Sequence, residues 1–446
     1  MSADSSSLEM VQHEPNHHTI QVDSDEKESW SIKGSCSIHR VPNCLRQGGK
    51  NAYVPQIVSI GPFHHSNKTL QAMNNNKNNY LRDVISWTQN NGRYSHKEIL
   101  DRYLDAVKSV EKKARACYSE TIYPNSNTFA EMMVIDGCFI IALLCKVAGL
   151  ITVHKDDPIF NMVWLWSKLQ NDLLMFENQI PFIILQRLFD LMKVLGGHDC
   201  PSLTRLALDF FEGLVPKIET ATKENPNIKP KHLLHLFHSS LLPTPKEYKP
   251  TKLNQREAND FNLIKSTKAL KKAGIKFKKA EAADSFFDVK FKAGTMEIPT
   301  IVIGESTNSV FLNLIAFEQC YSACTDHFTD YTAFMNCLIN SAIDVGTLCE
   351  SGIIVNWLGR DHEVANLFKM LAKTSTVSTN EFYLSDVFWE INQHRQTTYG
   401  ACMESLKRFY FNSFWSIFPF GAAIILLVLT FLQTIFTMHA YYHPPS

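Results

Sequence analysis

The pattern of hydrophobic and polar positions along the chain predicts a predominantly helical protein. Apolar residues recur every three or four positions between Ile99 and Val110, which places them on one face of an α-helix. A second helical stretch, 159–195, should break at Pro181, because a proline disfavours helix at the residue before it. Further helices are predicted at 129–148, 201–214, 231–242, 257–273 and from about Ser309 onward.

A β-signal is confined to one short region, 285–303. Phe287, Val289 and Phe291 alternate with polar residues, Ala293-Gly294 suits a turn, and 297–303 returns, which predicts a hairpin. The segment 53–60 is compatible with an extended chain. Two strands are too few for a core, so the expected fold is one large, mainly α domain with a small peripheral β-hairpin. Predicted strands and helices do not alternate along the chain, which argues against a nucleotide-binding α/β domain.

One segment near the C-terminus is apolar enough to cross a bilayer. No Asp, Glu, Lys or Arg occurs from Phe409 to Ser446, and Phe414 to Phe436 comprises 23 residues that begin with Phe414-Trp415. About 20 apolar residues suffice for a transmembrane helix. We therefore predict a transmembrane anchor region at 409–438 and a short tail at 439–446. The alternative is a buried core helix.

A competing apolar segment, 129–148, carries Asp136 in its interior and Glu131 and Lys146 near its ends. A charged residue at the centre of a membrane helix costs about 2.5–3.5 kcal/mol. We interpret this segment as a buried core helix, ended by Gly149.

The remaining regions follow from composition. Residues 1–31 are polar and acidic and predict a disordered tail, followed by a folded helical domain at 32–408. Within it, 220–256 is rich in Lys, Pro and Asn and should be a variable, exposed connection. The 44 basic and 44 acidic residues balance, so no overall attraction for nucleic acid is expected.

Flanking charges and cysteines predict the topology. Lys407 and Arg408 precede the apolar segment and only His439 and His443 follow it, which favours a single-pass, tail-anchored protein with its large domain in the cytosol. The 11 cysteines show no regular spacing and suit reduced thiols. Asn67-Lys68-Thr69 is a glycosylation sequon that matters only if the domain is extracellular.

Metal-binding patterns are weak. His232, His235 and His238 are spaced by three, which spreads them over an arc of about 120° on a helix. Cys320 and Cys324, with His327 beyond, lack a second ligand pair for zinc. We interpret the first set as part of an amphipathic helix and the second as buried thiols, and predict no metal site.

Catalytic patterns are equally weak. His64-His65 follow a Gly-Pro turn, and Glu177 lies in the sequence Glu177-Asn178-Gln179-Ile180-Pro181 at the helix break. Both could serve acid–base chemistry, but we favour structural roles, with the polar side chains satisfying backbone groups freed at the break. No phosphate-binding or nucleophile motif is present. We expect no catalytic residues, no cofactor and no small-molecule substrate.

Several blocks closely resemble the plant DUF247 family, also called UPF0481, from about Cys36 to the C-terminus. The blocks are 38–42, 53–65, 132–141, 176–182, 273–277, 297–299, 313–320, 336–342 and 356–359. Departures occur at Ala142, where the family often has Glu, at His235, where it often has Asp, and near Ser266-Thr267-Lys268.

The resemblance implies a plant protein of unassigned biochemistry without recognised catalytic residues. Some grass members look like male determinants of self-incompatibility that act with small secreted proteins. We therefore expect a membrane-anchored, non-catalytic interaction or signalling protein with an unknown protein partner. The alternatives are a self-recognition determinant and an uncharacterised enzyme.

Overall fold

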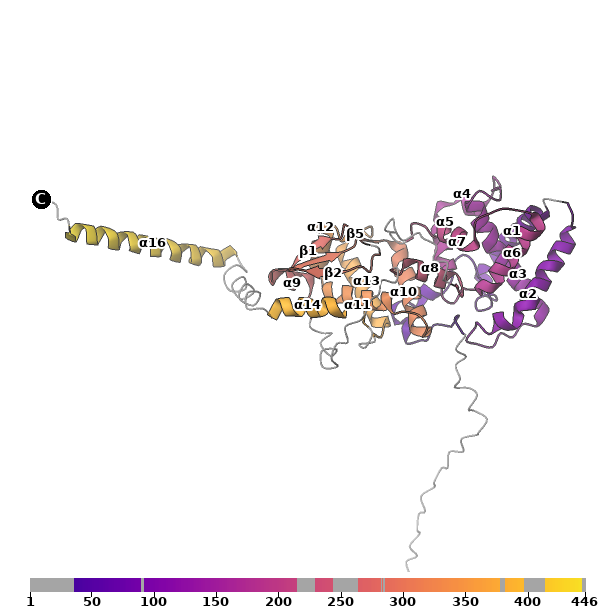
Figure 1. Ribbon diagram of the computed structural model, residues 1–446, viewed down its shortest axis with the longest axis horizontal. Helices are drawn as coiled ribbons and strands as arrows, with labels where there is room; N and C mark the ends of the chain where they lie inside the picture. The colour runs from indigo at the N-terminus through magenta and orange to yellow at the C-terminus, as the bar shows by residue number, and fades with distance from the viewer. Residues whose placement is uncertain are drawn as a thin grey trace, which may run out of the picture.

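The computed structural model of the protein describes residues 36–89, 92–214, 229–243, 264–281, 283, 285–377, 382–396 and 414–442. The predicted tail at 1–31 and most of the predicted connection at 220–256 lie outside the described residues. The described chain is mainly helical, as predicted, with a few short strands and an apolar C-terminal helix (Figure 1).

The N-terminal half is built around the long helix α3 (Ser126–Val147), which packs against α1 (Asn74–Thr88), α2 (His96–Arg115), α6 (Phe182–Gly196) and α7 (Leu203–Phe210). The Ser95 hydroxyl and Glu98 form a capping box that starts α2. Of the apolar window of α3, 83% is buried, which confirms the core-helix interpretation. The other elements of this half are three short 3-10 helices, η2 (Leu45–Gly48), η3 (Lys50–Tyr53) and η4 (Lys68–Met73), and the α-helices α4 (Pro158–Asn161), α5 (Val163–Leu173) and α8 (Leu233–Leu241).

The C-terminal half packs α10, α11 and α12 around α13. Its elements are α9 (Thr267–Lys272), β1 (Lys276–Lys279), β2 (Lys290–Lys292), β3 (Thr295–Ile298), β4 (Ile301–Ile303), α10 (Glu305–Cys320), α11 (His327–Leu338), α12 (Ala342–Glu350), β5 (Ile354–Asn356), α13 (Asp361–Thr374) and α14 (Ser385–Gln396).

The predicted hairpin exists, but the predicted bounds are wrong. Strands β2 and β3 pair antiparallel around Ala293-Gly294, and β1 joins them parallel to β3, giving the order β1-β3-β2. The returning strand ends at Ile298, before Pro299, and β4 pairs instead with β5 in a second, parallel sheet. A proline cannot donate a ladder hydrogen bond, so the chain leaves the first sheet there.

Several predicted helices are shorter or interrupted. The stretch 159–195 forms α4, α5 and α6, and its main break spans 174–181 rather than Pro181 alone. The predicted basic helix 257–273 begins only at Thr267 within the described residues, since 264–266 are not helical and 257–263 are not described. α10 begins at Glu305, earlier than predicted, because Gly304 and Thr307 cap it.

The two halves share one hydrophobic core. Helix α10 packs against α5, α8 and η3, and α13 packs against η2, so the first and last thirds of the folded domain are in contact. In Figure 1 the violet N-terminal helices occupy one end and the orange C-terminal helices the other.

The apolar helix α16 (Phe414–Tyr442) stands apart from this core (Figure 1). It contains the predicted span 414–436 and continues to Tyr442, so the predicted tail from 439 is partly helical. Residues 422–438 are all exposed.

Candidate functional site

A cluster of buried polar side chains lies where two N-terminal segments, 38–46 and 56–64, meet the segment 172–179, which leads from the end of α5 towards α6. We call this the loop junction. It brings together blocks that are far apart in the sequence and that carry the family resemblance.

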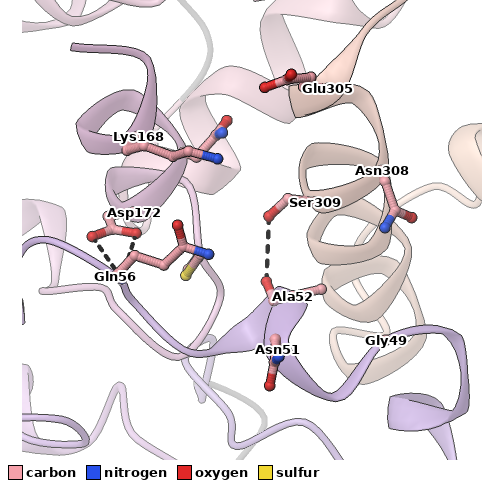
Figure 2. Close-up of a pocket in the computed structure, with 11 residues that line it drawn as sticks. Gly49, Asn51, Ala52, Gln56, Lys168, Asp172, Glu305, Asn308 and Ser309 are labelled. Atoms are coloured by element: carbon pink, nitrogen blue, oxygen red, sulfur yellow. Dashed lines mark hydrogen bonds between the residues drawn. The ribbon is translucent and has the colours of Figure 1, made fainter. Parts of the chain in front are cut away.

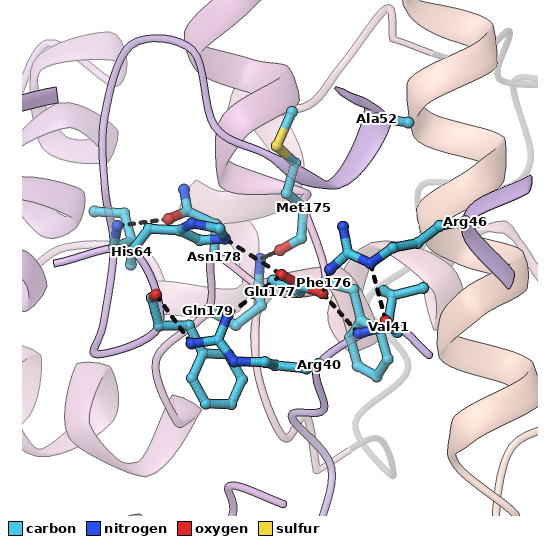
Figure 3. A network of polar contacts seen from close by, with 12 residues as sticks. Arg40, Val41, Arg46, Ala52, His64, Met175, Phe176, Glu177, Asn178 and Gln179 are labelled. Atoms are coloured by element: carbon cyan, nitrogen blue, oxygen red, sulfur yellow. Dashed lines mark hydrogen bonds and ion pairs between the residues drawn. The ribbon is translucent and has the colours of Figure 1, made fainter. Parts of the chain in front are cut away.

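Glu177 lies at the centre of the loop junction (Figure 3) and is 1% exposed. Its Oε1 accepts the Val41 N–H at 2.7 Å and pairs with the guanidinium of Arg46. Its Oε2 lies 3.8 Å from Arg40 Nη1 and 3.5 Å from His64 Nε2. One carboxylate therefore joins a backbone amide, two arginines and a histidine.

Electrostatics keep this carboxylate ionised. Burial alone would raise the pKa of Glu177, but His64, the Val41 N–H and Arg46 together outweigh burial and lower it. A base with a lowered pKa and occupied oxygens is a weak proton acceptor, so the geometry favours the structural interpretation of Glu177. His65, by contrast, is exposed and does not join the cluster.

Three further buried side chains hold the backbone of 56–61. Asp172 accepts the N–H groups of Gln56, Ile57 and Val58 at 2.6–3.0 Å. Asn178 accepts from Ile60 at 2.7 Å, and Asp136 accepts from Gly61 at 2.8 Å. The segment 53–60 is therefore not a strand, because side chains rather than a neighbouring strand satisfy its amides.

Gly61 is required by this arrangement. Its φ is +72°, and a Cβ built on it would lie 2.6 Å from the Gln179 carbonyl oxygen. Both the backbone conformation and the lack of space favour glycine.

The side-chain amides of Asn178 and Gln179 form hydrogen bonds with backbone groups around the helix break. Asn178 Nδ2 donates to the carbonyls of Val58 and Asp172, and Gln179 Nε2 donates to those of Leu173 and Met175. Gln179 Oε1 also accepts the Leu234 N–H at 3.2 Å. These contacts match the role predicted for polar residues at the break.

A polar hollow of about 330 Å³ adjoins the loop junction between α5 and α10 (Figure 2). Figure 2 shows Lys168 of α5 on one side and Glu305 and Ser309 of α10 on the other. Two of its polar side chains are engaged, Asp172 by backbone amides and Ser309 by the Ala52 carbonyl, whereas the buried side-chain oxygens of Asn171 and Asn308 accept no hydrogen bond from the described residues. Burial raises the pKa of Asp172 to about 6, against the opposing effect of its amide donors. No histidine or cysteine lines the hollow.

The three histidines near α8 have separate partners. His232 Nε2 donates to the Ser37 carbonyl at 2.9 Å, while its Nδ1 accepts the His235 N–H and caps the helix. His235 Nδ1 accepts the Lys231 N–H, and His238 Nε2 donates to Glu318 at 2.8 Å. Burial lowers the pKa of His235 to about 4. In the described part of the chain, no group of three or more His, Cys, Asp or Glu side chains is arranged so that it could hold a metal ion.

The Cys320, Cys324 and His327 set is also dispersed. Cys324 Sγ lies 3.6 and 3.7 Å from the two ring nitrogens of His238, so the thiol rests against the ring face. Burial raises the pKa of both cysteine thiols, and His327 stacks on Tyr383. Thiols with raised pKa values are poor nucleophiles and poor metal ligands at neutral pH.

Because Asp330 is buried, we expect the stability of the folded protein to depend measurably on pH. It is 3% exposed, its Oδ2 accepts the Tyr383 N–H, and burial raises its pKa from 3.8 to about 8. The folded state therefore favours the protonated acid, and stability from this group falls as the pH rises towards about 8. We expect Asp330→Asn to raise the melting temperature of the detergent-solubilised full chain, and more at about pH 8 than at about pH 5.

The control for this prediction is Asp101→Asn, at an exposed position on α2. Its melting temperature should follow the wild type at every pH. A pH dependence of Asp330→Asn that parallels the wild type would contradict the assignment.

The remaining predicted positions lie at the surface or at the anchor. Asn67 Oδ1 accepts the Thr69 N–H and hydroxyl at the start of η4, so the sequon forms a surface turn. Phe414 and Trp415 begin α16, and Phe436 is 70% exposed. α16 is long and apolar enough to span a membrane.

Sequence reasoning missed most partners in the loop junction. Arg40, Arg46, Lys77 and Asp172 were not singled out, although Asp136 within an apolar helix was a signal that a buried cation should exist. That cation is Lys77, with Nζ 2.5 Å from Asp136 Oδ1.

Comparison with known proteins agrees with the resemblance. Residues 38–429 match the family DUF247, described as a plant protein of unknown function. The chain is 32% identical to UPF0481 protein At3g47200 of Arabidopsis thaliana, over 92% of this chain and 87% of that protein. It is 24% identical to a second Arabidopsis UPF0481 protein, At3g02645, over 92% of each chain. No solved structure matches. The chain therefore belongs to the plant DUF247 (UPF0481) family.

Proposed function

We propose that the protein is a non-catalytic interaction protein, held by α16 as a single-pass anchor with its folded domain on the cytosolic side. The observation that carries this proposal is the contrast between two apolar helices. Both are long and apolar enough to cross a membrane, but 83% of the apolar window of α3 is buried and 0% of that of α16. An uncovered apolar helix of this length needs a bilayer or another apolar partner.

Cysteine chemistry supports the cytosolic side. Nine cysteines in the described residues are free thiols, among them Cys138 and Cys145 of α3, which lie in the hydrophobic core. Unpaired cysteines in this number are typical of reducing compartments. Lys407 and Arg408 before α16 favour the same orientation.

Two observations support an interaction role over catalysis. The carboxylates of the loop junction accept backbone amides, and Glu177 also pairs with arginine, so their oxygens are engaged within the protein. Large apolar side chains are exposed on the folded domain, including Val163 at 88%, Trp164 at 61% and Trp357 at 74%. Exposed tryptophans are enriched at protein–protein interfaces.

Charged substitutions within α16 test whether this helix is a membrane anchor. We expect the double variant Leu426→Lys and Leu427→Lys to leave the carbonate-resistant membrane fraction, because each lysine near the centre of a span costs about 2.5–3.5 kcal/mol. Val194→Lys, at a 78% exposed position of α6, is the control and should remain membrane-bound. A wild-type protein extracted by carbonate would contradict the proposal.

The orientation of the folded domain is tested on microsomes that contain the full-length protein. A protease added from outside should digest the folded domain, and Asn67 should carry no glycan. Protection of the domain together with glycosylated Asn67 would place it outside the cytosol and favour a self-recognition determinant instead.

A further inference from the structure

The segment 264–280 carries a concentrated positive charge. It contains seven lysines and no aspartate or glutamate in 17 residues, although the whole chain is neutral. The lysines come from α9, its approach and the edge strand β1, and all seven are exposed. Lys272 already has an interaction partner, and the other six are Lys265, Lys268, Lys271, Lys276, Lys278 and Lys279. We call these six residues the lysine surface.

Little of this charge is neutralised by the protein. Within the described residues, the ion pair formed by the lysine surface is that of Lys278 with Glu281, at 3.3 Å between side chains that are 58% and 80% exposed. Asp344 of α12, which packs against α9, is buried and uses its oxygens to accept the N–H groups of Lys268 and Ser341. Apart from the exposed pair of Lys278 with Glu281, the lysine surface forms no ion pair with the described residues, so it presents a net positive charge to its surroundings.

The lysine surface lies at the end of the domain from which the chain runs to the anchor. Its strand β1 belongs to the same three-stranded sheet as β2, and α14 packs against β2, with the His394 ring 5.6 Å from that of Phe291. α14 ends at Gln396 and α16 begins at Phe414, so 17 residues (397–413) separate them. That length spans at most about 60 Å. Figure 1 shows α9, β1, β2 and α14 together at this end.

We propose that the lysine surface lies against anionic lipid headgroups of the bilayer that holds α16. This inference rests on the proposed membrane anchor. Clusters of four to eight basic residues close to a membrane helix bind anionic leaflets through the surface potential, and Lys407 and Arg408 in the connecting segment add to the same charge.

The scarcity of aromatic residues among the lysines favours lipid over nucleic acid as the binding partner. Single-stranded nucleic acid is bound on aromatic side chains that stack with bases. The one aromatic residue in 264–280 is Phe277, which is half-buried in the sheet. The lysine surface offers charge without a stacking platform.

The test uses the full-length chain reconstituted in vesicles of neutral phosphatidylcholine, with or without about 30% phosphatidylserine. Lysine acetylation followed by mass spectrometry reports the accessibility of each residue. We expect Lys268, Lys271 and Lys276 to be modified several-fold more slowly in the anionic vesicles, and this protection to disappear at about 0.5 M salt. Lys97, Lys108 and Lys112 on α2, at the opposite end of the domain, should be modified equally in both vesicles.

Two matched triple variants test whether the lysine surface itself causes the protection from acetylation. Replacing Lys268, Lys271 and Lys276 by glutamine should reduce the protection of Lys279 to its level in neutral vesicles. Replacing Lys97, Lys108 and Lys112 by glutamine should leave that protection unchanged. Neither set includes residues of the loop junction or of α16.

The outcomes separate this inference from the proposed anchor. A protein that floats with both kinds of vesicle but shows equal acetylation in both overturns the inference and keeps the anchor. A protein that floats with neither kind overturns the anchor and, with it, the inference. Protection by added single-stranded RNA but not by anionic vesicles would assign the lysine surface to nucleic acid and also overturn the inference.

Discussion

Glu177→Ala is expected to lower the free energy of unfolding by about 3 kcal/mol, near the lower end of the range for breaking a buried ion pair. The substitution leaves the Val41 N–H without its acceptor and the guanidinium of Arg46 without its carboxylate. Arg46 is 22% exposed and can be partly rehydrated, which keeps the loss from being larger. Because Glu177 ties 38–46 to the segment 172–179, these segments should loosen together.

Thermal melting of the full chain in detergent measures this effect. We expect a decrease of roughly 4 °C. The matched control is Glu120→Ala, which removes the 3.1 Å pair with Arg40 at a position that is 50% exposed and should cost less than about 1 kcal/mol. An unchanged melting temperature with loss of partner binding would contradict the structural role and assign Glu177 to a binding surface.

The effect of Glu177→Ala should also depend on pH. The pKa of Glu177 is lowered in the folded protein, so its contribution is present above its ordinary value of 4.5 and is lost as the pH falls through the lowered one. The difference between variant and wild type should therefore shrink in acid.

Lys77→Met is expected to lower the free energy of unfolding by about 3–5 kcal/mol, because it leaves Asp136 charged and without a counterion inside the core. The two side chains are 3% and 2% exposed. Asp136 would retain the Gly61 N–H, and the Ser59 carbonyl would lose its donor, the Lys77 ammonium.

A double-mutant cycle separates the pair from simple packing. Asp136→Asn removes the charge while the amide oxygen can still accept the Gly61 N–H. The double variant, Lys77→Met with Asp136→Asn, should regain much of the stability lost in Lys77→Met. Additive losses in urea unfolding would show that the two residues are not coupled.

Local patterns predicted the elements whose stability is mainly local. The helix containing Ile99 and Val110 was found from its periodicity, and the structure adds the Ser95 capping box just before it. The turn at Ala293-Gly294 was found from its composition. In contrast, the pairing of β1 with β3 and of β4 with β5 depends on segments 19 and 53 residues apart, from Lys276 to Thr295 and from Ile301 to Ile354. No local signal specifies such pairings.

The loop junction shows the same division. The polar residues Glu177, Asn178 and Gln179 at a proline-broken helix indicated side chains that satisfy backbone groups. Their partners could not be inferred, because Val41 and Ile60 lie 136 and 118 residues away. The segment 53–60 is extended by pattern, but Asp172 and Asn178 take the amides that a neighbouring strand would otherwise bind.

By itself, the sequence predicted long apolar helices at 129–148 and 414–436, since length and side-chain hydropathy are local properties. Asp136 already indicated that the first is a core helix, but only the tertiary structure decided which surfaces cover it and that the second stays uncovered. Burial depends on which surfaces the rest of the chain brings to a helix, and those surfaces come from α1, α2, α6 and α7. Asp136 is tolerated inside α3 for the same reason: Lys77, 59 residues earlier, is placed beside it by the packing of α1 on α3.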